Sequence, residues 1–66
     1  MGQLFDLRQK IESTIASQGL DAVKVKGSIG LKTGVLLNLV NASTPDDATK
    51  IERLRAAVKE VLGVSL

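Results

Sequence analysis

The sequence predicts a single α+β domain whose elements run in the order helix, strand, strand, helix. Apolar residues recur every three or four positions near the amino end and again in the last third of the chain, which is typical of amphipathic helices. Between these segments apolar and polar residues alternate, which is typical of half-buried strands. The chain has 66 residues, the length of one domain, and we assign that domain to residues 1–66.

The first helix is predicted from Gln3 to Gln18. Its apolar residues share one face, because their spacings of three and four match the helical repeat. They are Leu4, Leu7, Ile11 and Ile15. Gly19 follows at the position where a left-handed residue commonly ends a helix.

Two antiparallel strands are predicted next. In the first, Lys24, Lys26, Ser28 and Gly30 alternate with an apolar set consisting of Val23, Val25, Ile29 and Leu31. The second strand runs from Val35 to about Asn41. A three-residue loop, Lys32-Thr33-Gly34, puts the apolar residues of both strands on one face and predicts a positive φ at Gly34.

The last helix is predicted to begin near Pro45, with Thr44 as its N-cap. Asp46 and Asp47 are then expected near the positive end of the helix dipole. Its apolar stripe consists of Ile51, Leu54, Val58, Val61 and Leu62, and Gly63 is expected to end it. The tail, residues 64–66, is expected to add at most a short strand.

Both helices are expected to pack on one face of the antiparallel β-hairpin, which completes an α-β-β-α fold. A two-stranded hairpin has two open edges and is rarely stable alone. We therefore expect two chains to pair edge to edge, which extends the sheet to four strands in a homodimer. The alternative is a monomer in which the C-terminal tail supplies a third strand.

The composition excludes several kinds of chemistry. The chain has no cysteine and no histidine, so it contains neither disulfides nor zinc sites built on those residues. No catalytic, cofactor-binding or metal-binding residue is predicted, because helix capping accounts for Asp46 and Asp47 and no activated nucleophile is visible. We expect a protein that is not an enzyme. No run of about 20 apolar residues and no signal-peptide pattern is present, so a cytoplasmic location is predicted.

The candidate binding surface is the outer face of the hairpin. It is basic and apolar, and its residues are Lys24, Lys26, Lys32, Leu36, Asn38 and Val40. A protein partner is expected there or on an exposed strand edge, because strand addition is a common recognition mode. Nucleic acid is a less favoured partner, since the net charge is only +2 and Phe5 is the only aromatic residue. Alternatively, the lysines only solvate the exposed face.

The chain is also similar in pattern to BON domains from Val23 onward. The matching features are the alternating segment, Gly34 before an apolar segment, and Val61-Leu62-Gly63-Val64 at the end of the last helix. This resemblance implies binding of a small ligand or a lipid. No binding residue of that family is carried over to this sequence. The sequence as a whole favours a non-enzymatic interaction module that acts as a homodimer, with nucleic-acid binding and BON-like ligand binding as alternatives.

Overall fold

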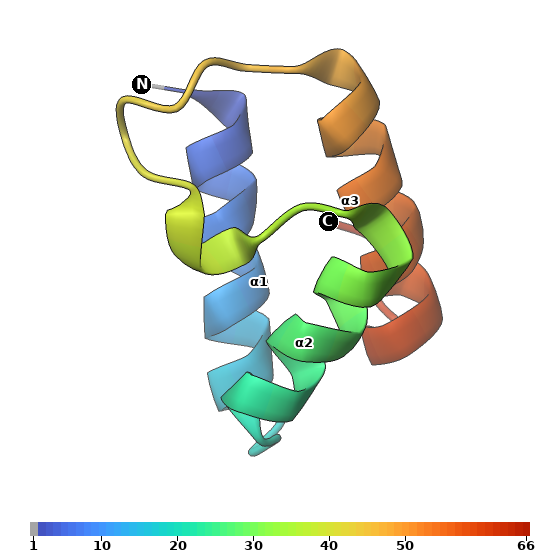
Figure 1. The fold of residues 1–66 in the computed structure, drawn as a ribbon. Coiled ribbons are helices and arrows are strands. Elements are labelled where there is room, and N and C mark those ends of the chain that lie inside the picture. Colours follow the sequence, from blue (N-terminus) through green and yellow to red (C-terminus); the bar gives the residue numbers. More distant parts are fainter. Residues whose placement is uncertain (1) are drawn as a thin grey trace.

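Three α-helices and one 3-10 turn form the fold in the computed structural model, which describes residues 2–66. In chain order they are α1 (Gln3–Ser17), α2 (Ala22–Thr33), the 3-10 turn η1 (Leu37–Leu39) and α3 (Ala48–Leu62). No strand occurs within residues 2–66. The prediction of an α+β fold with an antiparallel hairpin, and of a four-stranded sheet built by two chains, is therefore wrong. The chain folds as a small helical bundle (Figure 1).

One hydrophobic core lies between the three helices. In Figure 1, α1 and α3 stand roughly upright, α2 leans across their lower half, and η1 lies over α1. Both terminal helices supply four or five buried residues each, whereas α2 supplies one large aliphatic side chain, Ile29. The core residues are Leu4, Leu7, Ile11, Ile15, Ile29, Val35, Leu37, Val40, Ile51, Leu54, Ala57, Val58 and Leu62.

The first helix agrees with its prediction. It spans Gln3–Ser17, and its four predicted apolar residues are all buried. Gly19 has a φ of 68°, a left-handed conformation that glycine adopts without steric cost. The residue therefore ends the helical path as expected.

The segment predicted as the first strand is helix α2, because capping groups stand at both of its ends. The Asp21 carboxylate accepts hydrogen bonds from the backbone N–H groups of Val23 and Lys24. At the other end, Gly34 is left-handed with a φ of 72°, and its N–H donates to the Gly30 carbonyl. The predicted positive φ at Gly34 is confirmed, but it closes a helix rather than a hairpin.

The segment predicted as the second strand is extended but unpaired. Leu36 and Val40 have extended backbone angles on either side of η1. Val35 and Leu37 point into the core, as the predicted alternation requires. The 3-10 turn then shifts the alternation, so that Leu39 is exposed and Val40 is buried. This short extended segment therefore covers the core, although no second strand pairs with it.

The last helix begins at Ala48, three residues later than predicted. Its N-cap is Asp47, whose carboxylate accepts from the N–H groups of Thr49 and Lys50. Asp46 instead reaches the start of α1, where its Oδ1 accepts from the Leu4 N–H at 3.0 Å. Each of the two neighbouring carboxylates therefore serves a different helix. Gly63 ends α3 with a φ of 72°, as predicted.

We expect Asp46→Asn to lower stability in a way that depends on pH. The N–H of Leu4, and after it that of Gln3, holds the pKa of Asp46 below its ordinary value of 3.8. The ionised carboxylate therefore stabilises the fold above that value, and the effect is lost as the pH falls through the lower folded-state pKa. Thermal unfolding should show a lower Tm for the variant at pH 7 and no difference at about pH 2.

Glu52→Gln, on the exposed side of α3, is the control for loss of one negative charge. A Tm difference for Asp46→Asn that persists unchanged at about pH 2 would contradict the role of the charged carboxylate.

Candidate functional site

Large apolar side chains remain exposed on one part of this small bundle. Val23 and Leu31 of α2 are 82% and 92% exposed, and Leu36 and Leu39 around η1 are 61% and 69% exposed. Leu20, just before α2, is also exposed. Single apolar residues on a surface are ordinary, but several that share one region indicate an interaction site.

Two hollows connect Val23, Leu36 and Leu39 across α2 and η1, whereas Leu31 lines neither of them. The first, the α2–η1 groove, has a volume of about 220 Å³ and is lined by Ala22, Val23, Lys26, Gly27, Leu36, Leu37 and Asn38. The second has a volume of about 270 Å³ and includes Leu36 and Leu39 in its wall. Because Leu36 borders both hollows, the exposed apolar surface continues from Val23 to Leu39.

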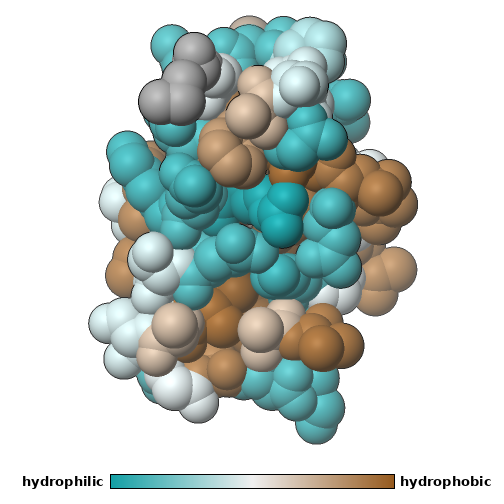
Figure 2. Space-filling view, turned by 90° about the vertical axis from the view of Figure 1, so that its left-hand side faces the viewer, coloured by the Kyte–Doolittle hydropathy of each residue, from teal (hydrophilic) through white to brown (hydrophobic). Residues whose placement is uncertain are grey.

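The α1 side of the molecule differs from this surface. Figure 2 shows a face that is mostly hydrophilic across its centre, with hydrophobic residues toward its right-hand margin and in its lower part. A polar cluster ties this side to α2 and η1, and we call it the Glu12 cluster: Arg8, Glu12, Lys26 and Asn38. The groove therefore has one polar wall.

Lys26 is the centre of the Glu12 cluster. Its Nζ lies 2.6 Å from Glu12 Oε1 on α1 and 3.3 Å from Asn38 Oδ1 in η1. The hydrogen bond from Lys26 holds the pKa of Glu12 below its ordinary value of 4.5, although partial burial acts in the opposite direction. Arg8 adds a bond to Glu12 at 3.4 Å and another to the Val40 carbonyl. These contacts fix η1 against α1 and α2.

The structure divides the six predicted binding residues into three groups. Lys26, Leu36 and Asn38 line the α2–η1 groove together. Lys24 and Lys32 lie on α2 outside it, and Lys32 pairs with Glu60 of α3 at 3.0 Å. Val40 is a core residue with its side chain buried.

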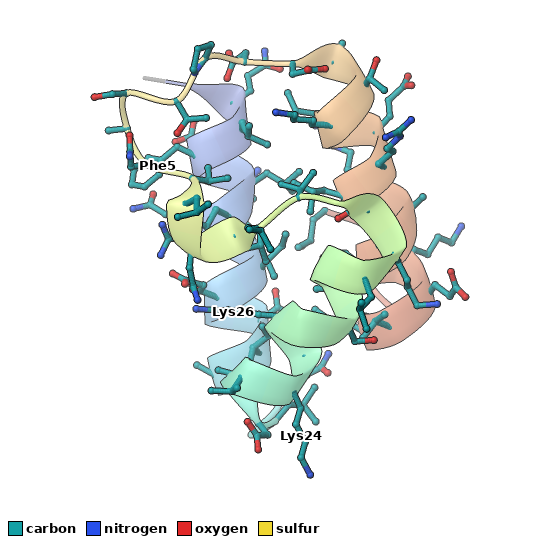
Figure 3. The ribbon with its side chains drawn as sticks, in the orientation of Figure 1. Phe5, Lys24 and Lys26 are labelled. Atoms are coloured by element: carbon teal, nitrogen blue, oxygen red, sulfur yellow. The ribbon has the colours of Figure 1, made fainter. Side chains whose placement is uncertain are left out.

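The predicted basic face does not exist in the described residues, because a helix directs its lysines differently from a strand. Lys24 and Lys26 are two positions apart, which places them on one face of a strand but about 160° apart around a helix. In Figure 3, Lys24 points away from the body of the protein, whereas Lys26 points toward α1. Two of the three lysines are engaged in ion pairs.

Three residues of this surface were not predicted as binding residues: Val23, Gly27 and Leu31. They are four positions apart along α2, so they form one row on its outer side, which we call the α2 stripe. All three are exposed. A Cβ placed on Gly27 would meet no atom within 4 Å. The row could have been found by a helical projection of residues 22–33, had the segment been taken as a helix.

The described residues were searched for clusters of metal-ligating side chains and for membrane-spanning helices. Within residues 2–66 no three acidic side chains come together as potential metal ligands. No helix in the described part of the chain is long and apolar enough to cross a membrane. The candidate site is therefore the apolar surface of α2 and η1, where the most exposed large apolar side chains lie.

The chain was compared with protein families, curated proteins and solved structures. No family model, no curated protein and no solved structure matches the chain. The residues of the α2–η1 surface are therefore the basis for inferring a function.

Proposed function

We propose that this chain is a small, non-enzymatic interaction module of the cytoplasm that binds another polypeptide through the exposed apolar surface of α2 and η1. One observation carries the proposal. Val23, Leu31, Leu36 and Leu39 leave most of their side chains in water, although the bundle around them is otherwise packed. The earlier expectation of a strand edge as the docking site is replaced by this helical surface.

The energetics favour coverage of the surface. Burying a Val or Leu side chain that is fully exposed contributes about 1.5–3 kcal/mol. The four residues could together contribute several kcal/mol, against an association cost of about 4–15 kcal/mol. A partner must therefore cover most of the surface at once, as an amphipathic helix does when it binds an apolar groove.

The polar wall of the groove supports the choice of a polypeptide partner. Lys26 and Asn38 lie beside Val23 and Leu36, so the groove offers hydrogen-bonding groups next to apolar contacts. This is the arrangement of protein interfaces, in which polar groups surround an apolar centre. Nucleic-acid binding is not favoured, because Lys26 and Lys32 already have acidic partners.

Photo-crosslinking in the native cell tests the proposal. A benzophenone side chain at Leu31 should give a covalent adduct with one polypeptide, and an additional Val23→Lys substitution should remove it. A benzophenone at Arg53, exposed on α3, is the matched control and should give no such adduct. If the adducts from Leu31 equal those from Arg53, or survive Val23→Lys, the surface is not a docking site.

A further inference from the structure

We infer that the partner of the α2 surface is a second copy of this chain, and that the two α2 helices cross in antiparallel orientation at Gly27. The inference rests on the proposed function and names its partner. Beyond the proposed function, it specifies the residue at the crossing point, the orientation of the two helices and the residue pairs that meet.

The α2 stripe is symmetric about Gly27, with one apolar side chain on either side of it. Val23 lies four residues before Gly27 and Leu31 lies four residues after it, at about 6 Å on either side along the helix axis. In an antiparallel crossing about a two-fold axis at Gly27, Val23 of each copy faces Leu31 of the other. The same surface therefore complements itself, as a two-fold interface requires.

The space above Gly27 is open on the outer side of α2. A Cβ there would meet nothing within 4 Å, so packing inside one chain does not require glycine. Glycine in a helix interior is nevertheless less favourable than other residues. A missing side chain between two exposed apolar ones allows a second helix to approach closely at that point.

The surface of α2 is hollow on the carboxyl side of Gly27, where a side chain of the second copy could fit. In helix packing, a side chain of one helix fits between four residues spaced i, i+3, i+4 and i+7 on the other. For Val23 of the second copy these residues are Gly27, Gly30, Leu31 and Gly34. Three of the four are glycines, of which Gly34 is the left-handed C-cap of α2. The Leu36 side chain borders the hollow, since its Cδ2 lies 3.8 Å from the position of a Cβ on Gly30. A β-branched side chain would fit beside it.

The positive charge of Lys24 favours the antiparallel orientation of the two α2 helices. Lys24 lies next to the α2 stripe and has no acidic side chain within 4 Å among the described residues. A parallel crossing would bring both Lys24 side chains to the same height near the axis, which is repulsive. The antiparallel crossing instead places Lys24 near the carboxyl end of the other α2, where Glu60 pairs with Lys32 and balances its positive charge.

The area available sets the expected affinity. The helix α2 has 12 residues, so it is about 18 Å long. A contact of this length lies at the low end of specific interfaces, below about 1,200 Å² in total. We therefore expect a reversible dimer with a dissociation constant of about 0.1 mM, so that the chain is monomeric at about 5 μM.

Single-cysteine variants test the geometry, since the natural sequence contains no cysteine. Packed helices lie about 8–10 Å apart, so facing Cα atoms at the crossing are within reach of a disulfide. In glutathione buffer at about 0.5 mM protein, Gly27→Cys should form an intermolecular disulfide at least tenfold more than Ala56→Cys on the exposed side of α3. Equal amounts from the two variants would overturn the inference.

A mixture of Val23→Cys and Leu31→Cys chains tests the orientation. The antiparallel crossing joins these two chains to each other, whereas two Leu31 positions lie about 12 Å apart along the axis. The mixed disulfide should exceed either symmetric one at least tenfold. If the symmetric disulfides prevail, the helices are parallel and the inference is wrong.

Sedimentation equilibrium separates this inference from the proposed function. The natural chain should dimerise between about 1 μM and 1 mM, and Leu31→Lys should remain monomeric, while Ala56→Lys should dimerise like the natural chain. A natural chain that is monomeric at about 1 mM overturns the second copy as partner. In that case an adduct of Leu31 with a different protein in the cell would still support the docking surface.

Discussion

Ile29→Ala is expected to lower the free energy of unfolding by about 2–5 kcal/mol, whereas Leu31→Ala should change it by less than about 0.5 kcal/mol. Ile29 is 0% exposed and is the only large aliphatic side chain that α2 places in the core. Leu31 is 92% exposed. A chain of this length has a total stability of about 3–10 kcal/mol, so loss of the Ile29 side chain removes much of it.

Urea denaturation at about 5 μM protein measures both variants in the monomeric state. The pair is also a test of the fold, because residues two positions apart share a face in a strand but lie about 160° apart around a helix. Similar losses of stability for Ile29→Ala and Leu31→Ala would mean that both side chains point into the core. That result would contradict the helix α2.

The two terminal helices could be predicted from the sequence because several local signals agree there. In residues 3–17 the apolar spacing, the exposed polar positions and the following Gly19 all favour a helix. The same agreement holds for residues 48–62 with Gly63. The start of α3 was placed too early because Asp46 binds the N–H of Leu4, a partner 42 positions away that no local pattern indicates.

The middle of the chain was mispredicted because its apolar order fits both a strand and a helix. Val23, Val25, Ile29 and Leu31 alternate as a strand requires, yet only Ile29 is fully buried, and Val25 is half-buried. The decisive signals were the capping groups. Asp21 before the segment and Gly34 after it match the ends of a helix.

Physical cost also favours the helix over the hairpin. A two-stranded hairpin would leave the outer N–H and C=O groups of both strands without partners. A helix satisfies these groups within its own segment, even where valine, threonine and glycine give it low propensity. With α1 and α3 supplying most of the core, α2 needs to bury little more than Ile29.

The candidate site was predicted in part. Lys26, Leu36 and Asn38 were selected for a sheet face, and they do line one groove, because η1 keeps Leu36 and Asn38 on its outer side. Whether they bind a partner remains a prediction. The prediction that Lys24, Lys32 and Val40 share this surface depended on a sheet. Because the segment is not a sheet, these three residues lie elsewhere. The α2 stripe depends on the helix and could not be seen from alternation.

Gly27→Leu is expected to make the monomer more stable and the dimer weaker. Glycine in a helix interior costs about 0.8–1.0 kcal/mol relative to alanine, and leucine is nearly as favourable as alanine. A Cβ at Gly27 meets no atom within 4 Å, and the groove of about 220 Å³ that Gly27 lines offers space for the rest of the side chain. The Tm of the variant at about 5 μM should therefore rise by about 3–8 °C. In the dimer, the leucine side chains of both copies would meet at the crossing point and hold the helices apart.

The dissociation constant measured by sedimentation equilibrium should increase at least tenfold for Gly27→Leu. Gly27→Ala is the intermediate control, because it gives the same gain in helix propensity with a much smaller side chain. A variant that is more stable but dimerises like the natural chain would place the crossing away from Gly27. A variant that is less stable would mean that the space above Gly27 is already filled within one chain. Opposite changes in the two quantities are expected only if glycine at this position serves the contact between two chains rather than the fold of one.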